Sequence, residues 1–399
     1  MAVSFTTDLS QGKGKSAMVN QERLSDVFRA LVEIDSVSKE EGAIAKNLDK
    51  IFKSMGAEVV FDGAGLKVRG DTDNLIARFH GPETEVTPLL LNAHMDTVQP
   101  GKGIKILFSD GIFSSDGTTI LGADDKSALA IIIETIRVLQ ENGLRHGPLE
   151  VVVTVCEEIG LLGAKNLDYS LLEARHGYSL DASDTDGIVT RAPAANHLQF
   201  KIYGRDAHAG AAPEKGINAI QLASRAISRI GGGRIDEETT ANIGRIEGGT
   251  ATNIVPGLVT VAGEVRSHSP EKLEDETRKI VRCFEEEISM YKESFPSEDG
   301  LPRVETAIRS DFSAMKVPED HLVVDLAKEA ASRLGREMKS KTSGGGSDGN
   351  IFFEHGIVVG ILGTGMKDMH TVRESIRLDD MVKCAELLLE IVQLHAKGV

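Results

Sequence analysis

Residues that can bind a metal ion or move a proton recur directly after apolar runs of this chain. His94 and Asp96 follow the run LLLNA. Glu157 and Glu158 follow VVVTVC, and Asp181 follows GYSL. Each has a simpler explanation of its own, because a lone His-x-Asp is often a core histidine with its partner, and two glutamates after a strand often form a solvated turn. Taken together, histidines and carboxylates are the ligands that zinc takes in hydrolytic sites.

Two further candidates have other surroundings. His370 follows the stretch VVGILGTGMKDM and could instead pair with the nearby Glu374. Asp124, in LGADDK, stands where a long helix is expected to begin, so that either Asp124 or Asp125 could simply cap it. The glycine-rich stretch at 343–349, SGGGSDG, is typical of a flexible loop. It could bind an anion through backbone amides, but it lacks the Lys-Ser/Thr ending of a P-loop.

The elements that must position these residues alternate between strands and helices in the first half of the chain. We expect helices at 22–34, 42–55 and 126–143, and strands at 58–61, 75–79, 89–92 and 149–156. This alternation predicts an α/β fold with a mostly parallel sheet flanked by helices. Because the carboxyl ends of parallel strands form the binding crevice of such a sheet, the candidate residues should converge there.

The pattern changes around Ala195. Strand-like and helical runs then follow in the order β-α-β-β-α-β, at 197–204, 216–230, 241–249, 257–268, 269–293 and 303–312. This order is typical of a ferredoxin-like α+β module. After it the helix–strand alternation resumes. We therefore expect a catalytic domain in two parts, 18–195 and 313–399, interrupted by a smaller domain at 196–312, with residues 1–17 as a disordered tail.

The composition excludes several classes of function. A formal net charge of −16 argues against a nucleic-acid partner. No apolar run approaches the roughly 18 residues of a membrane-spanning helix, so no membrane partner is expected. Three widely spaced cysteines without a C-x-x-C pair fit a reducing compartment, and we expect a cytoplasmic protein. Cys156 ends an apolar run and is expected to be a buried structural thiol rather than a nucleophile.

The motifs in their order along the chain resemble a known family. HMD, GADDK, CEE, SLD and a late MH are similar to the zinc-dependent exopeptidases that include peptidase T, the glutamate carboxypeptidases, aminoacylase and succinyl-diaminopimelate desuccinylase. The resemblance covers nearly the whole chain and is closest to peptidase T-like proteins. It implies that His94 and Asp181 bind one zinc ion, that Glu158 and His370 bind a second, and that Asp124 bridges the two. Cobalt or manganese could occupy the same ligands.

The same resemblance assigns two residues around the metals. Glu157 would be the general base, because it cannot bind a metal and accept a proton at once. Asp96 would hold the ring of His94 rather than bind metal itself. Three carboxylate ligands would offset most of the charge of two zinc ions, so the cluster could be buried.

The inserted domain resembles the lid of this family. His208, in GRDAHAGAAPEKG, would stabilise the oxyanion of the reaction. Asn253, in GTATNIVPG, would contact the substrate, and Arg266, in GEVRSH, would bind a substrate carboxylate through its guanidinium fork. In several relatives the lid histidine reaches the site of a partner subunit, so a homodimer through the lid is expected. Asp348, in GGGSDGN, lies in a family-like loop and is given no role.

These residues together predict a two-zinc metallopeptidase that removes the N-terminal residue from short peptides, in the manner of a tripeptide aminopeptidase. An amidohydrolase, deacylase or dipeptidase acting on N-acyl amino acids could use the same dinuclear site. A non-catalytic, metal-binding regulator would be expected to lack part of the set, whereas Glu157 and Asp96 are both present. The sequence does not identify the group that would recognise a free α-amine.

Overall fold

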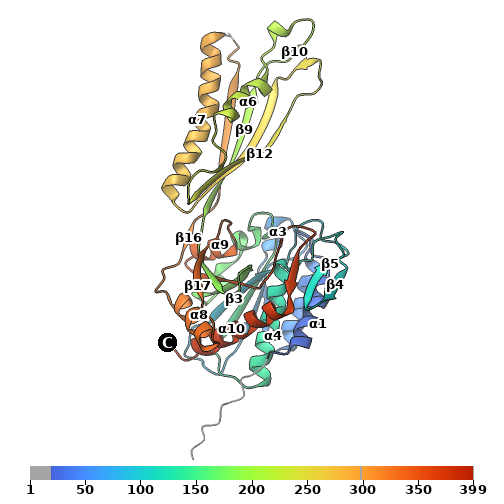
Figure 1. Ribbon diagram of the computed structural model, residues 1–399, viewed down its shortest axis with the longest axis vertical. Coiled ribbons are helices and arrows are strands. Elements are labelled where there is room, and N and C mark those ends of the chain that lie inside the picture. Colours follow the sequence, from blue (N-terminus) through green and yellow to red (C-terminus); the bar gives the residue numbers. More distant parts are fainter. Residues whose placement is uncertain (1–18, 297–298, 399) are drawn as a thin grey trace, which may run out of the picture.

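The computed structural model describes residues 19–296 and 299–398, so the tail expected at 1–17 lies outside the described residues. Figure 1 shows two parts that follow one another along the longest axis of the molecule. One part holds a nine-stranded sheet with helices packed on it, and the other holds a separate five-stranded sheet with two helices. The fold class predicted from the sequence is confirmed.

The nine-stranded sheet positions the candidate residues. Its strands, in spatial order, are β1 (Glu58–Phe61), β2 (Leu75–Phe79), β6 (Leu149–Thr154), β3 (Leu89–His94), β7 (His176–Ala182), β18 (Val358–Gly363), β8 (Gly187–Ala192) and β16 (Met315–Lys316), with β17 (Lys339–Thr342) also paired to β8. The four central strands β6, β3, β7 and β18 run parallel, and β1, β2 and β16 are antiparallel to their neighbours. Every residue of β3 and β6 is buried, as expected for parallel strands covered on both faces.

Four helices form a layer beside this sheet. α1 (Gln21–Val32) contacts α4 (Ala123–Glu141), α4 contacts α10 (Leu378–His395), and α10 contacts α8 (Leu322–Arg333). α4 also lies against β3 and β7, and nearly all of its side chains are buried. The interior is mainly aliphatic, as expected of a chain with only 4% aromatic residues, although rings such as Phe28, Phe52 and Tyr178 are fully buried in it. No helix among the described residues is both long and apolar enough to cross a membrane.

The start of α4 differs from the prediction that Asp124 or Asp125 caps it. The helix begins after Gly122, which has a positive φ of 75°, and no side chain caps it. Asp124 and Asp125 both have non-helical backbone angles, which separate Ala123 from the regular helix. Their side chains are therefore free to serve other partners.

The five-stranded sheet belongs to the lid. β9 (Ala194–Tyr203), α6 (Ala219–Ser228), β12 (Thr239–Gly248), β14 (Leu258–Ser267), α7 (Pro270–Ser294) and β15 (Arg303–Phe312) follow in the order predicted, with the short β11 (Gly233–Arg234) at one edge. The strands are antiparallel neighbours, and α6 and α7 bury an apolar cluster of their own against them. Ser269 caps α7 by accepting a hydrogen bond from the backbone N–H of Lys272. A short pair, β10 (Ala207–His208) and β13 (Ile254–Val255), completes the lid.

Several short elements have no counterpart in the sequence prediction. They are α3 (Ala64–Val68), the hairpin β4 (Ile106–Ser109) and β5 (Ile112–Ser115), α5 (Leu162–Asn166), α9 (Asp348–Glu354) and β19 (Ser375–Arg377). The predicted helix at 42–55 is α2 (Gly42–Ser54). α9 begins inside the stretch that was expected to be a flexible loop, because Ser347 and Asn350 form a capping box there.

Candidate active site

The carboxyl ends of the central strands bring the candidate residues to one edge of the sheet. His94 is the last residue of β3, Glu157 and Glu158 come shortly after β6, and Asp181 lies near the end of β7. A cavity of about 540 Å³ opens there, in the size range of small-molecule sites. The acidic and histidine side chains that line it are Asp124, Glu157, Glu158, Asp181, Asp184 and His370.

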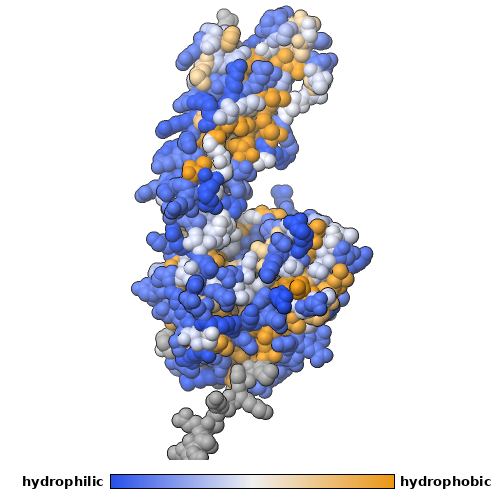
Figure 2. Space-filling model, in the orientation of Figure 1, coloured by the Kyte–Doolittle hydropathy of each residue, from blue (hydrophilic) through white to orange (hydrophobic). Residues whose placement is uncertain are grey.

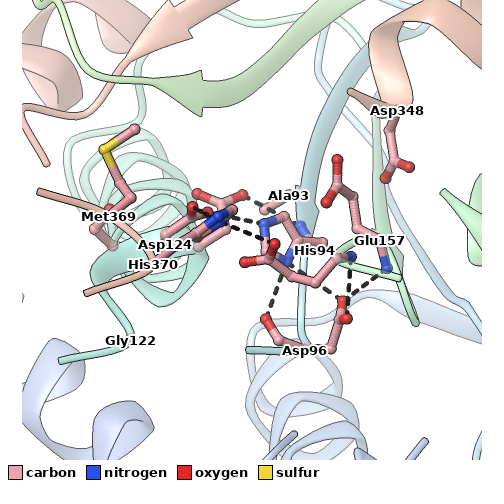
Figure 3. Close-up of polar contacts among 12 residues, drawn as sticks. Ala93, His94, Asp96, Gly122, Asp124, Glu157, Asp348, Met369 and His370 are labelled. Carbon is pink, nitrogen blue, oxygen red and sulfur yellow. Dashed lines mark hydrogen bonds and ion pairs between the residues drawn. The ribbon is translucent and has the colours of Figure 1, made fainter. Parts of the chain in front are cut away.

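Asp124 lies between the two histidines. Its Oδ1 is 3.0 Å from His94 Nε2, and its Oδ2 is 3.2 Å from His370 Nε2 (Figure 3). Glu158 Oε2 contacts the same His370 nitrogen at 2.9 Å. One carboxylate thus faces a different imidazole with each of its oxygens, so that Asp124 lies between two of the expected metal ligands.

Asp96 holds both His94 and the turn of the two glutamates. The ring nitrogen Nδ1 of His94 is 3.0 Å from the Asp96 carbonyl oxygen and 3.4 Å from its Oδ1. The same carboxylate accepts the backbone N–H of Glu157 at 2.9 Å and that of Glu158 at 3.2 Å. Ser38 donates its hydroxyl to Asp96 Oδ2 at 2.6 Å. Asp96 therefore fixes more of the site than the histidine orientation that the sequence predicted.

The two glutamates point in different directions. Glu158 faces His370, whereas Glu157 is directed toward the side of the site where Asp348 lies (Figure 3). Burial and the nearby negative charge of Asp181 raise the pKa of Glu157 well above its usual range. Burial and the charge of Asp124 raise the pKa of Asp181 in the same way. A carboxyl group with a raised pKa accepts a proton more readily than an ordinary glutamate does.

The same negative charges also raise the pKa of the histidines, because they favour the protonated ring. Hydrogen bonds with Asp124 and Glu158 raise the pKa of His370 to about 10. Burial disfavours the charged ring of His94, but its hydrogen bonds with Asp124 and Asp96 outweigh this and raise its pKa. Burial likewise opposes ionisation of Asp124, yet the two histidines hold its pKa well below the usual range. The site therefore stabilises positive charge between its carboxylates.

The donor set fits divalent metal ions. Two groups of three residues could each hold a metal ion, because the ligand atoms within each group lie within 4.8 Å of one another. One group is His94, Asp124 and Glu158, and the other is Asp124, Asp125 and Asp181. Oε1 of Glu158 and Oδ1 of Asp125 are buried without a hydrogen-bond partner. Buried carboxylate oxygens require such a partner or a cation. Both groups include Asp124, the expected bridging ligand. Unlike the sequence-based expectation, they place His94 with Glu158 and Asp181 with Asp125, and neither group includes His370.

Two residues near the cluster, Asp125 and Glu374, were considered in the sequence only as a helix cap and as a partner of His370. Asp125 is fully buried and accepts the backbone N–H of His94 at 3.2 Å. Glu374 does not pair with His370, which was the alternative weighed from the sequence. Its carboxylate accepts the backbone N–H groups of Leu121 and Gly122, each at 2.7 Å, and that of Asp124 at 3.0 Å. Glu374 thus fixes the backbone that carries Asp124.

The lid residues are distributed over its length. Arg266 lies at the base of the lid, near Gly345 of the loop that lines the cavity, and pairs with Glu264 at 3.1 Å. His208 belongs to β10 and Asn253 precedes β13, and Figure 1 shows β10 at the end of the lid remote from the nine-stranded sheet. The structure of one chain therefore brings Arg266 close to the cavity but leaves His208 and Asn253 away from it.

Asp348 and Cys156, which the sequence analysis also considered, are both buried. Oδ2 of Asp348 accepts the hydroxyl of Thr154. The sulfur of Cys156 lies 3.3 Å from Glu41 Oε1, which also accepts the Cys156 N–H at 2.9 Å. Burial and the charge of Glu41 raise the pKa of this thiol, as expected for an unreactive cysteine.

A cluster of histidines and carboxylates at the edge of a parallel sheet, with a separate antiparallel lid, defines a metal-dependent hydrolase. Residues 90–394 match the Peptidase family M20/M25/M40, and the chain belongs to this family. It is a metallopeptidase by family membership and by the donor set of its site.

The similarity to known proteins covers almost the whole chain. The chain is 43% identical to the uncharacterized protein YqjE of Bacillus subtilis strain 168 over 381 residues, which cover 95% of this chain and 100% of that protein. It is 42% identical to the crystal structure of aminopeptidase PepT from Bacillus cereus, with a TM-score of 0.85 and coverage of 95% and 100%. A tripeptidase from Staphylococcus aureus is 38% identical, with a TM-score of 0.88 and the same coverage.

Proposed function

We propose that this chain is a two-metal aminopeptidase that removes the N-terminal residue from short peptides, tripeptides above all. The observation that carries the proposal is the placement of Asp124 between His94 and His370, in a cavity that Asp124, His370 and Glu157 line together. Similarity over the full length to an aminopeptidase and a tripeptidase supports the choice of substrate.

Different residues would hold the metal ions and transfer the proton during peptide hydrolysis. His94, Asp124, Glu158, Asp181 and His370 would hold two zinc ions, or cobalt or manganese in their place, and Asp125 is a further candidate ligand. Bound metals supply Lewis acidity that polarises the scissile carbonyl and acidifies water. Glu157 would accept a proton from the attacking water and pass it to the leaving amine. Asp96 keeps Glu157 and Glu158 in place through their backbone N–H groups.

The lid would complete the substrate site. Arg266 lies near the loop that lines the cavity and would bind the carboxylate of a short peptide. His208 and Asn253 would reach the cavity of a second copy, because they lie at the far end of their own lid. Large apolar side chains are exposed on the lid at Ile220, Ile246, Ile254 and Leu258. Figure 2 shows an apolar patch on this part of the molecule, which supports a homodimer formed through the lid.

A product assay separates the aminopeptidase from the amidohydrolase that shares its chemistry. The zinc-loaded protein receives one tripeptide in two forms, with a free and with an acetylated N-terminus, and mass spectrometry identifies the products. We expect cleavage of the free form only, with release of its first residue. Equal or faster cleavage of the acetylated form would instead show a deacylase or a carboxypeptidase-like enzyme. A Glu157→Gln variant, run in parallel, controls for contaminating peptidases.

A further inference from the structure

An ion pair joins the base of the lid to the part of the catalytic domain that follows the glutamate turn. Nζ of Lys165, in α5, lies 2.7 Å from Oδ1 of Asp311, the residue before the last of β15. The side chain of Asp311 is only 8% exposed and that of Lys165 24% exposed. A contact buried to this extent constrains the two parts more firmly than a solvated pair would.

The position of Asp311 lets it contact both parts at once. The pairing of β15 with β9 shifts its register between Ser310 and Phe312, so Asp311 is left out of the ladder. Its Oδ1 faces Lys165, and its Oδ2 lies 3.0 Å from Nε2 of His197 in the lid strand β9. Burial opposes the charge of Asp311, but Lys165 and His197 outweigh it and hold its pKa below the usual value.

Lys165 extends this contact to the turn that carries Glu157. Its ammonium group also donates to the carbonyl oxygen of Gly160 at 2.8 Å. The carbonyl oxygen of Glu157 in turn accepts the N–H groups of Gly160 at 3.0 Å and Leu161 at 2.7 Å. The turn is thus held at two places, by Asp96 through its N–H groups and by Lys165 at its far end.

An apolar cluster surrounds the same junction. Leu161 and Ala164 pack with Ala195 and Phe312. The chain enters the lid at Ala195 and leaves it at Phe312. A Cβ atom at Gly346, in the loop that lines the cavity, would lie 2.3 Å from the ring of Phe312. The lid base therefore contacts two walls of the active site, and neither can move without affecting the packing of the linkers.

We propose that Lys165 and Asp311 are positioning residues, which couple the placement of the lid to the placement of the turn that carries Glu157 and Glu158. The proposal rests on the proposed function for its consequence, because a shift of this turn moves Glu157 relative to the substrate. The coupling itself concerns only the chain and can be measured without a substrate.

Hydrogen–deuterium exchange of the full-length protein tests the coupling. We compare Lys165→Met, Asp311→Asn and the double variant with Arg309→Met. Arg309 is the matched control, since it lies 3.8 Å from the same carboxylate but is 70% exposed. We expect both single variants to raise exchange at 157–162 and at 310–313 together, by about tenfold or more. Arg309→Met should leave both segments unchanged. The double variant should raise exchange by less than the two single effects combined, because the two residues share one ion pair.

Steady-state kinetics on a free tripeptide gives the second measurement. The variants should lower kcat by about tenfold or more with KM within about twofold, because misplacement of a reacting group affects the chemical step. Metal content by mass spectrometry should stay that of the parent protein. Increased exchange at 310–313 alone, or an unchanged kcat, would show that the pair merely braces the lid and would overturn the proposal. If the parent protein cleaves no peptide, the proposed function fails, while the exchange result still decides the coupling.

Discussion

Glu374→Gln tests how Asp124, the proposed bridging carboxylate, is held in place. The substitution keeps the shape of the side chain but replaces one acceptor oxygen by an NH₂ group. Because Leu121 and Gly122 share one oxygen and Asp124 uses the other, the amide can satisfy one side only. At least one buried backbone N–H then faces another donor.

The magnitude follows from these hydrogen bonds. A hydrogen bond to a charged group contributes about 1.5–3 kcal/mol, and a buried donor left without a partner costs about 1–3 kcal/mol. We therefore expect Glu374→Gln to lower the free energy of unfolding of the metal-free protein by about 3 kcal/mol. We also expect metal affinity to fall about 10- to 100-fold, because Glu374 fixes the backbone of Asp124, which is the proposed bridging ligand.

Two assays measure these effects separately. Urea unfolding of the metal-free protein gives the stability, and competition with a chromophoric chelator gives the zinc affinity. Glu337→Gln makes the same chemical change at a side chain that is 78% exposed, and it should alter neither quantity. A Glu374→Gln protein that loses stability but keeps its zinc affinity would refute the reasoning, since Asp124 would then be positioned without Glu374.

Three further predictions concern the site and its support. Glu157→Gln should lower kcat by about 10²- to 10⁴-fold while mass spectrometry still finds two metal ions, and full activity would remove Glu157 from the role of base. His395 lies 3.0 Å from His176 through their Nε2 atoms, and burial lowers its pKa to about 4. Below pH 6.5 the unfolded chain therefore binds more protons than the folded one, so stability falls as the pH falls. Urea unfolding should show that this residue accounts for about 2 kcal/mol of loss between pH 7.5 and 5, and His395→Gln should show a loss smaller by that amount. Gly346→Ala should lower the melting temperature, at a cost of about 1–3 kcal/mol, because its Cβ would overlap Phe312; an unchanged melting curve would contradict the packing described.

The main elements were predictable because their patterns are strong. LEVVVTVC reads as a strand buried on both faces, and β6 is such a strand. The lid elements follow clear changes between strand and helix periodicity, and their order agrees with the structure. The hairpin of β4 and β5 escaped because its strands have four residues each and β4 is largely exposed. α9 was not predicted because the glycines before it are typical of a loop, and because its start depends on the capping residues Ser347 and Asn350.

The site was predictable where side chains follow strands. His94, Glu158, Asp181 and His370 reach one edge because their strands are parallel neighbours, although the roles assigned to them stay predictions. Glu374 could not be recognised, because its partners are backbone groups some 250 residues earlier in the chain. Backbone N–H groups carry no sequence signature. The distance between His208 and the cavity also depends on the orientation of the lid, which periodicity does not encode.

The pairing of β9 with β15 has a consequence for how this protein could be altered. The chain enters the lid at Ala195 and leaves it at Phe312, and these residues lie opposite one another in adjacent antiparallel strands. Their Cα atoms are therefore about 5 Å apart, a gap that a tight turn can close. A short hairpin loop in place of the lid would therefore leave the strand register of the catalytic sheet unchanged. Another lid could be grafted between these two positions only if it kept Asp311, because the Asp311 carboxylate contacts Lys165 beside the turn of the two glutamates.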